Sequence, residues 1–114
     1  GAAMFTEMAK AAGFESGPFS PESYDAAALL ILAMQAAKST DSQDFKSKVM
    51  DVANAPGQKV FPGDLGKALE FIASGGDVDY VGASAVELIG PGESAGSYKE
   101  ILVKDGKNTT VGYR

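Results

Sequence analysis

The stretch "YDAAALLILAMQAA", Tyr24 to Ala37, decides how this sequence is interpreted. Nine apolar residues follow one another from Ala26 to Met34, so no phase of a helix would leave a polar face. A helix that is apolar all round must be covered by protein on every side, or must lie in lipid. A membrane-spanning helix needs about 20 predominantly apolar residues, and this run is much shorter. The sequence therefore predicts a buried helix in a soluble domain.

Composition narrows the class of protein further. The hydrophobic share of 45% and the charged share of 22% are ordinary for a folded globular domain. The formal net charge of −5 argues against binding to nucleic acid or to an anionic membrane, because both favour a basic patch. The chain has no cysteine and no histidine, which excludes thiol nucleophiles and the usual catalytic triads and zinc sites. We therefore expect no enzyme, no metal and no cofactor.

Hydrophobic periodicity and turn residues predict four helices, over residues 3–12, 21–38, 41–54 and 64–74. Ser20 can cap the second helix, with Pro21 at its first position. Thr40 and Gln43 have the spacing of a capping box before the third helix. Asp64 can cap the fourth helix, which ends at the glycines that follow it.

Strand signals come only after Gly76. Residues 78–89 and 97–114 are rich in β-branched and aromatic side chains, and Asp105-Gly106 is a strong signal for a β-hairpin. The glycine-rich residues 90–96 are predicted to form a linker. These strands are short, late and partly polar, unlike the apolar strands of a central parallel sheet. The sheet that the apolar helix needs is therefore missing, which indicates a fragment of a larger α/β fold.

A candidate ligand site lies just before the apolar helix. Phe19, Ser20 and Tyr24 cluster where the chain enters the helix N-terminus, which offers free backbone N–H groups. An aromatic side chain beside such donors can form one wall of a pocket for a small ligand. The alternative interpretation is structural: a hydrophobic staple at the helix start and a tyrosine that packs in the core.

Three stretches together resemble one known family. "GPFSPESYDAAALLILAMQAAKSTDSQDFKSKVMDV", "FPGDLGKALEFIASGGDVDYVGASAVEL" and "GESAGSYKEILVKDGK" are similar, in order and spacing, to the C-terminal part of a type I periplasmic binding protein. The closest group is the branched-chain amino acid receptors of ABC transporters. The most specific parts are "YDA" at residues 24–26, "DVDYVGAS" at residues 77–84, and the final hairpin. The sequence departs from the group at "LIGPGESAG", where members commonly carry an acidic turn.

The resemblance implies a two-lobed α/β receptor that clamps a small solute and presents it to a membrane permease in the periplasm, without catalysis. Residues 1–96 would contribute to the first lobe, and residues 97–114 would form a hinge crossing and a hairpin that belong with the second lobe. The resemblance places the ligand contact at Phe19, with Ser20, Glu22 and Tyr24 as neighbours. The expected ligand is a branched-chain or similar aliphatic amino acid.

The resemblance also implies that the site in these 114 residues is incomplete. The main contacts to the ligand's amino and carboxylate groups would come from segments outside this sequence, so we expect little binding by the chain alone. We also expect self-association, because an exposed apolar helix favours contacts that remove its surface from water. Two alternatives remain: a segment of a cytoplasmic amide-sensing regulator of the same fold, or a freestanding small α+β interaction domain with its own sheet beneath the apolar helix.

Overall fold

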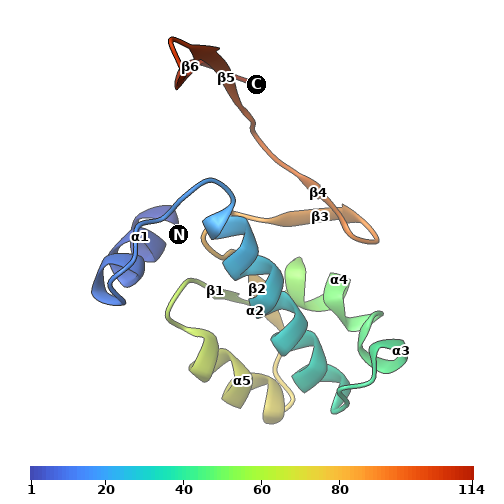
Figure 1. Cartoon of the computed structure of the whole chain (residues 1–114). Helices are drawn as coiled ribbons and strands as arrows, with labels where there is room; N and C mark the ends of the chain where they lie inside the picture. The colour runs from blue at the N-terminus through green and yellow to red at the C-terminus, as the bar shows by residue number, and fades with distance from the viewer.

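Helix α2, Ser20–Ala37, lies at the centre of the computed structural model, which describes residues 1–114 (Figure 1). The other elements are, in chain order, α1 (Ala2–Ala11), α3 (Ser42–Phe45), α4 (Lys48–Ala53), β1 (Gln58–Val60), α5 (Leu65–Ala73), β2 (Val78–Tyr80), β3 (Glu87–Gly90), β4 (Glu93–Ala95), β5 (Lys99–Lys104) and β6 (Lys107–Tyr113). The mixed α/β class is therefore as predicted, with five helices and three small sheets.

A two-stranded parallel sheet lies behind α2. Strands β1 and β2 pair in the register Gln58 with Val78 and Val60 with Tyr80, and α5 connects them as a βαβ unit. The prediction that no strand precedes Gly76 is wrong. Strand β1 has only three residues, and Val60 is its single buried side chain. A strand this short and this polar leaves no alternating pattern for the sequence to display.

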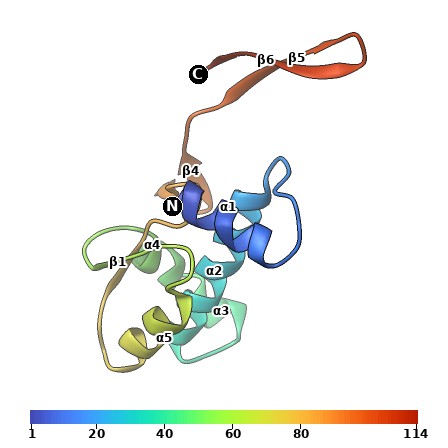
Figure 2. The same ribbon diagram turned by 90° about the vertical axis from the view of Figure 1, so that its left-hand side faces the viewer.

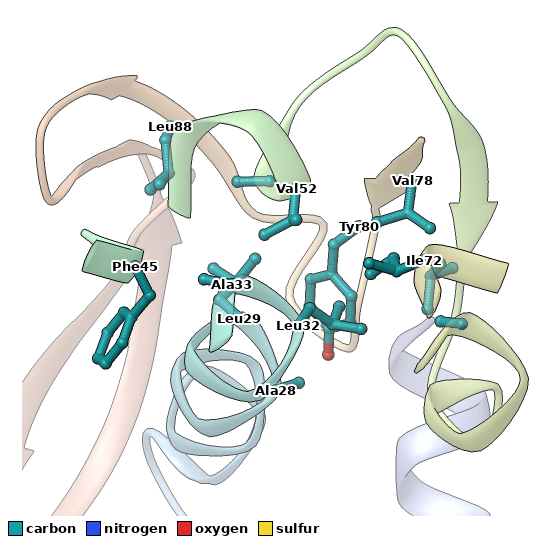
Figure 3. Close-up of a cluster of buried hydrophobic side chains, with 13 residues drawn as sticks. Ala28, Leu29, Leu32, Ala33, Phe45, Val52, Ile72, Val78, Tyr80 and Leu88 are labelled. Atoms are coloured by element: carbon teal, nitrogen blue, oxygen red, sulfur yellow. The ribbon is translucent and has the colours of Figure 1, made fainter. Parts of the chain in front are cut away.

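The core forms between α2, this sheet and the helices beside it (Figure 3). Its thirteen buried residues are Ala28, Leu29, Leu32, Ala33, Phe45, Val52, Ala53, Val60, Ala68, Ile72, Val78, Tyr80 and Leu88. Helices α4 and α5 each turn an apolar face to this core: Val52 and Ile72 are buried, and their helical neighbours Val49 and Leu69 pack against the same core. Sheet and helices therefore cover one side of α2.

The other side of α2 is open. Leu30 and Ile31 are 44% and 42% exposed, and Ala26 and Ala27 beside them are also exposed. This exposure agrees with the expectation that these residues alone do not cover the helix on every side. A sheet of two short strands covers one face of a helix and has no second layer for the opposite face. No helix of this structure has the length and apolar character needed to cross a membrane.

The predicted bounds of α1, α2 and α5 agree with the structure within one or two residues, whereas the helix predicted over residues 41–54 is divided. It consists of α3 and α4, separated by a turn at Lys46 and Ser47. The capping residue is Asp41, whose Oδ1 accepts a hydrogen bond from the Gln43 N–H at 2.9 Å. The predicted cap at Thr40 is therefore wrong by one residue.

The two antiparallel hairpins differ in how far the sequence anticipated them. Strands β3 and β4 pair across residues predicted to be a linker, with a turn at Pro91 and Gly92. The hairpin of β5 and β6 is confirmed. Its turn residues Asp105 and Gly106 both have positive φ, at 52° and 72°, as a tight two-residue hairpin turn requires.

The hairpin of β5 and β6 projects from the rest of the molecule (Figures 1 and 2). The radius of gyration is 15.7 Å, whereas a compact chain of this length would have about 13 Å. All residues of the hairpin are exposed except Gly112, which is half-buried. The structure therefore consists of a packed body, residues 1–96, and a protruding hairpin, residues 97–114.

Candidate functional site

The N-terminal end of α2 meets the loops that follow β1 and β2. The Tyr24 hydroxyl accepts a hydrogen bond from the Gly63 N–H, 3.4 Å away, in the loop after β1. Asp25 accepts hydrogen bonds from Ala83 and Ser84 in the loop after β2. In open α/β sheets, ligands bind outside the carboxyl ends of the strands. We call this region, formed by the start of α2 and the loops after β1 and β2, the carboxyl-edge site.

Asp25 holds the carboxyl-edge site together. It is the only buried charged residue of the chain and is 2% exposed. Its Oδ1 accepts from the Tyr80 hydroxyl and the Ala83 N–H, both at 2.8 Å, and its Oδ2 accepts from the Ser84 N–H at 2.7 Å and from the Ser84 hydroxyl. Burying a carboxylate is costly unless it is hydrogen-bonded, and here donors approach both oxygens. The side chain therefore fixes the loop after β2 to the start of α2.

Gly82 allows this loop to approach the carboxylate. Its φ is +67°, in the left-handed region that side chains disfavour, and it is buried. A Cβ at this position would overlap Asp25 Oδ1 and would lie 2.5 Å from the Tyr80 ring. Glycine is therefore required here for two independent reasons, the backbone conformation and the space.

The environment of Tyr80 keeps its hydroxyl protonated. Burial raises the pKa of Tyr80 far above its ordinary value, and the hydrogen bond to Asp25 and the nearby negative charge raise it further. The hydroxyl therefore remains a donor to Asp25 at all ordinary pH values. In the structure this hydroxyl donates to the buried carboxylate of Asp25.

Helix α1 packs against the carboxyl-edge site. The Phe5 ring is buried, and its centroid lies 5.4 Å from that of Tyr24, with the rings tilted at 54°. Gly1 lies directly against the backbone of Gly82, and a Cβ on Gly63 would lie 3.7 Å from the Met8 sulfur. Tyr24 is thus a half-buried side chain that packs on Phe5 and is not part of the main core.

The structure separates the four predicted site residues into two kinds. Tyr24 belongs to the packed part of the carboxyl-edge site. Phe19 is 77% exposed and Glu22 is exposed on the first turn of α2. Ser20 does not cap the helix as predicted: it is the first helical residue, and its Oγ accepts from the Gly17 N–H at 3.0 Å.

Phe19 has an unusual backbone. It is the residue before α2, with φ 65° and ψ 4°, and its side chain is in solvent. A bulky residue in the left-handed region is uncommon, because its Cβ crowds the backbone. Here the strained conformation presents an aromatic ring to solvent beside the carboxyl-edge site.

One groove of the body does not include the predicted residues. It has a volume of about 260 Å³ and lies between α4, β2 and β3, where Asn54, Asp79 and Glu87 line it. Asn54 joins two of these elements, since its side chain donates to the Leu88 carbonyl at 2.9 Å and accepts from the Leu88 N–H at 3.0 Å. The carboxyl-edge site is therefore an assembled surface without a deep pocket of its own.

Sequence reasoning missed the role of Asp25, although a signal was present. Asp25 stands three, four and seven residues before Ala28, Leu29 and Leu32, so a helix places it on the same face as these core residues. A carboxylate on the core face needs buried donors. That requirement alone would have indicated a polar cluster at the start of α2.

Comparisons with protein-family models, with curated proteins and with solved structures find no match to this chain.

Proposed function

We propose that this chain is part of a solute-binding receptor of the type I periplasmic binding protein fold. The observation that carries the proposal is the carboxyl-edge site, where Asp25 ties the start of α2 to the loop after β2. Open α/β sheets bind small ligands at this edge. The resemblance places the family's ligand contact at the same end of α2, so two independent arguments support one location.

Within this proposal the residues have distinct roles. The exposed Phe19 ring contacts the apolar part of the ligand, and Ser20 and Glu22 border it at the start of α2. Tyr24 supports this surface from behind through its contact with Phe5. The ligand is a branched-chain or similar aliphatic amino acid, captured in the periplasm for the permease of an ABC transporter, with no chemical step.

The proposal also explains the open geometry of the site. One wall with an exposed aromatic ring and no deep pocket can contribute a contact but cannot enclose an amino acid, and small-molecule sites bury most of the ligand. The rest of the site belongs to other segments of the receptor. The hairpin of β5 and β6 would pack with the second lobe, which accounts for its lack of contact with the body.

Calorimetry tests whether the site is incomplete. Titration of the 114-residue chain with leucine and with valine should give no binding heat at micromolar ligand concentrations. Saturable micromolar binding would contradict the incomplete site. The complementary test is the coding sequence on either side of these codons, which should encode the remaining segments of a two-lobed receptor. Flanking sequence without an α/β pattern would refute the receptor proposal itself.

Phe19 offers a direct test of its proposed role. Phe19→Gly removes an exposed ring and relieves a left-handed backbone, so the free energy of unfolding should stay the same or rise by about 0.5–1 kcal/mol. In the complete receptor, the same substitution should weaken amino-acid binding at least tenfold. Phe14→Gly, a substitution of another exposed aromatic before α2, is the matched control and should leave binding unchanged.

One observation favours a second candidate function, a small α+β interaction domain. Strands β1 and β2 give α2 a sheet of its own, which the interaction-domain alternative requires. This candidate expects a cooperative unfolding transition and a folded monomer at all concentrations. Flanking sequence and the oligomeric state discriminate between the two candidates.

A further inference from the structure

Two apolar surfaces of this chain have no partner within it. The first, the α2 stripe, consists of the exposed residues Ala26, Ala27, Leu30 and Ile31. The second is on the projecting hairpin, where every large apolar side chain is exposed. These are Tyr98, Ile101, Leu102, Val103, Val111 and Tyr113.

The apolar side chains of the hairpin favour one of its two faces. Residues that alternate along a strand share a face, and directly paired residues on the neighbouring strand share it too. Ile101 and Val103 lie on one face with Lys99 and with the three cross-strand partners of these residues, which are Tyr113, Thr110 and Asn108. Leu102 lies on the opposite face with Tyr98 and with Lys104 and Lys107, which pair with each other. We call the first of these the Ile101 face.

The hairpin needs a support that its own body does not provide. A two-stranded hairpin is at best marginally stable in water unless a third strand or a helix packs on it. The Ile101 face is apolar enough to pack on a helix, yet residues 97–114 project away from the body in both views (Figures 1 and 2). The surface that packs on the hairpin must therefore belong to another molecule.

The net charges of the body and the hairpin indicate that this other molecule is a second copy of the chain. Residues 1–96 contain six lysines and thirteen acidic residues, for a net charge of −7, whereas residues 97–114 contain four basic and two acidic residues, for a net charge of +2. The hairpin of one copy is thus attracted by the body of another. Two bodies that met directly through their α2 stripes would instead repel each other.

The hairpin is also long enough to cover the α2 stripe. The longer hairpin strand has seven residues, or about 23 Å at the rise of a β-strand. The α2 stripe runs from Ala26 to Ile31, or about 8 Å along the 18-residue helix. The hairpin can therefore lie along α2 and cover the α2 stripe, which would remove both exposed surfaces in one contact.

We propose that two copies of this chain exchange their hairpins, with the Ile101 face of each hairpin packed on the α2 stripe of the other copy. The contact occurs twice about a two-fold axis, as in reciprocal domain swapping. Residues 96–98, between β4 and β5, carry the hairpin across. This inference concerns the 114-residue chain itself and rests on its two exposed surfaces, and it is incompatible with the monomeric interaction domain.

Disulfide trapping tests the exchange, because the chain contains no cysteine of its own. Ile31→Cys and Val103→Cys are prepared as separate single variants, mixed and oxidised. The exchange predicts a disulfide between the two unlike variants. Leu102→Cys, on the opposite face of the same strand, replaces Val103→Cys in the control mixture, where the unlike disulfide should form at least tenfold more slowly.

Any other result of the disulfide trapping would contradict the proposal. A disulfide only between two Ile31→Cys chains would show that the α2 stripes pack on each other. Equal rates for the Val103 and Leu102 variants would show unselective collision. The Ile31→Cys/Val103→Cys double variant should give linked dimers, and an intrachain disulfide in a monomer would show that the hairpin folds back on its own α2.

Sedimentation equilibrium of the unmodified chain should give a dimer at micromolar concentration, and a monomer at that concentration would also exclude the exchange.

Discussion

At the scale of single residues, Asp25 is the one charged side chain that is buried in the fold. It is a buried carboxylate within an apolar helix, and its two oxygens accept hydrogen bonds from Tyr80, Ala83 and Ser84. These donors come from residues more than fifty positions later in the chain, so one side chain joins distant segments. Removing one partner of such a cluster leaves the others buried and unsatisfied.

We predict that Asp25→Asn lowers the free energy of unfolding by about 3 kcal/mol, because an amide nitrogen replaces one of the two accepting oxygens and faces donors. Urea denaturation checks the value. Glu22→Gln, an exposed acid on the same helix, is the control and should cost less than about 1 kcal/mol. Equal effects of the two substitutions would mean that the Asp25 cluster does not stabilise the fold.

Because of Tyr80, we predict that the stability of the chain decreases at alkaline pH. Burial raises its pKa in the folded state, so its contribution is complete below the unfolded value of about 10 and is lost as the pH rises above that value. The free energy of unfolding should fall by up to about 1.4 kcal/mol per pH unit above pH 10 from this residue alone.

The comparison is Tyr80→Phe, which should be less stable at pH 8 by about 1–2 kcal/mol, because Asp25 loses a donor. Its stability should fall less steeply than that of the unmodified chain between pH 10 and pH 11. Parallel curves for the two proteins in this range would show that Tyr80 does not cause the dependence.

At the scale of elements, α2 presents two apolar faces with different surroundings. Leu32 is fully buried against the sheet and its neighbouring helices, whereas Leu30, two residues earlier, is nearly half exposed. The two residues have the same side chain in the same helix. Only the position of the other elements makes their environments different.

We therefore predict that Leu32→Ala lowers the free energy of unfolding by about 3 kcal/mol, because it leaves a cavity in the core. Leu30→Ala should cost less than about 1 kcal/mol, since water already contacts that side chain. Both values are measured by urea denaturation at protein concentrations low enough for a monomer. A large cost for Leu30→Ala under those conditions would show that the α2 stripe is covered within the chain.

At the scale of the whole molecule, the body and the hairpin are separate units. The core residues all lie between Ala28 and Leu88, and none comes from residues 97–114. The resemblance also implies a division of the chain at residue 96. Whether the two parts belong to different lobes of a receptor stays a prediction.

Truncation after residue 96 tests this separation. The shortened chain should retain the urea midpoint of the dilute full-length chain, because it keeps every core contact. It should also be monomeric at concentrations where the full chain dimerises, since the exchanged hairpin is absent. An unfolded product would show that the hairpin stabilises the body within one chain. A dimer of the shortened chain would contradict the hairpin exchange.

The sequence by itself determined the elements whose signals are local. Side-chain periodicity and backbone preference act over a few residues. They determine the start and end of α2, the apolar faces of α4 and α5, and the Asp105-Gly106 turn. Phe19 and Tyr24 could be singled out for the same reason, as aromatic residues at a helix start. The sequence could not distinguish their environments.

Only the tertiary structure decided what required distant partners. Strand β1 exists because β2 and α5 complete its pairing and cover Val60, and three residues cannot signal this alone. Tyr24 is packed and Phe19 is exposed because α1 covers one and not the other. Asp25 is tolerated in the core because Tyr80, Ala83 and Ser84 reach it from far along the chain. Burial and hydrogen bonding between distant residues are properties of the folded arrangement, and local sequence patterns do not contain them.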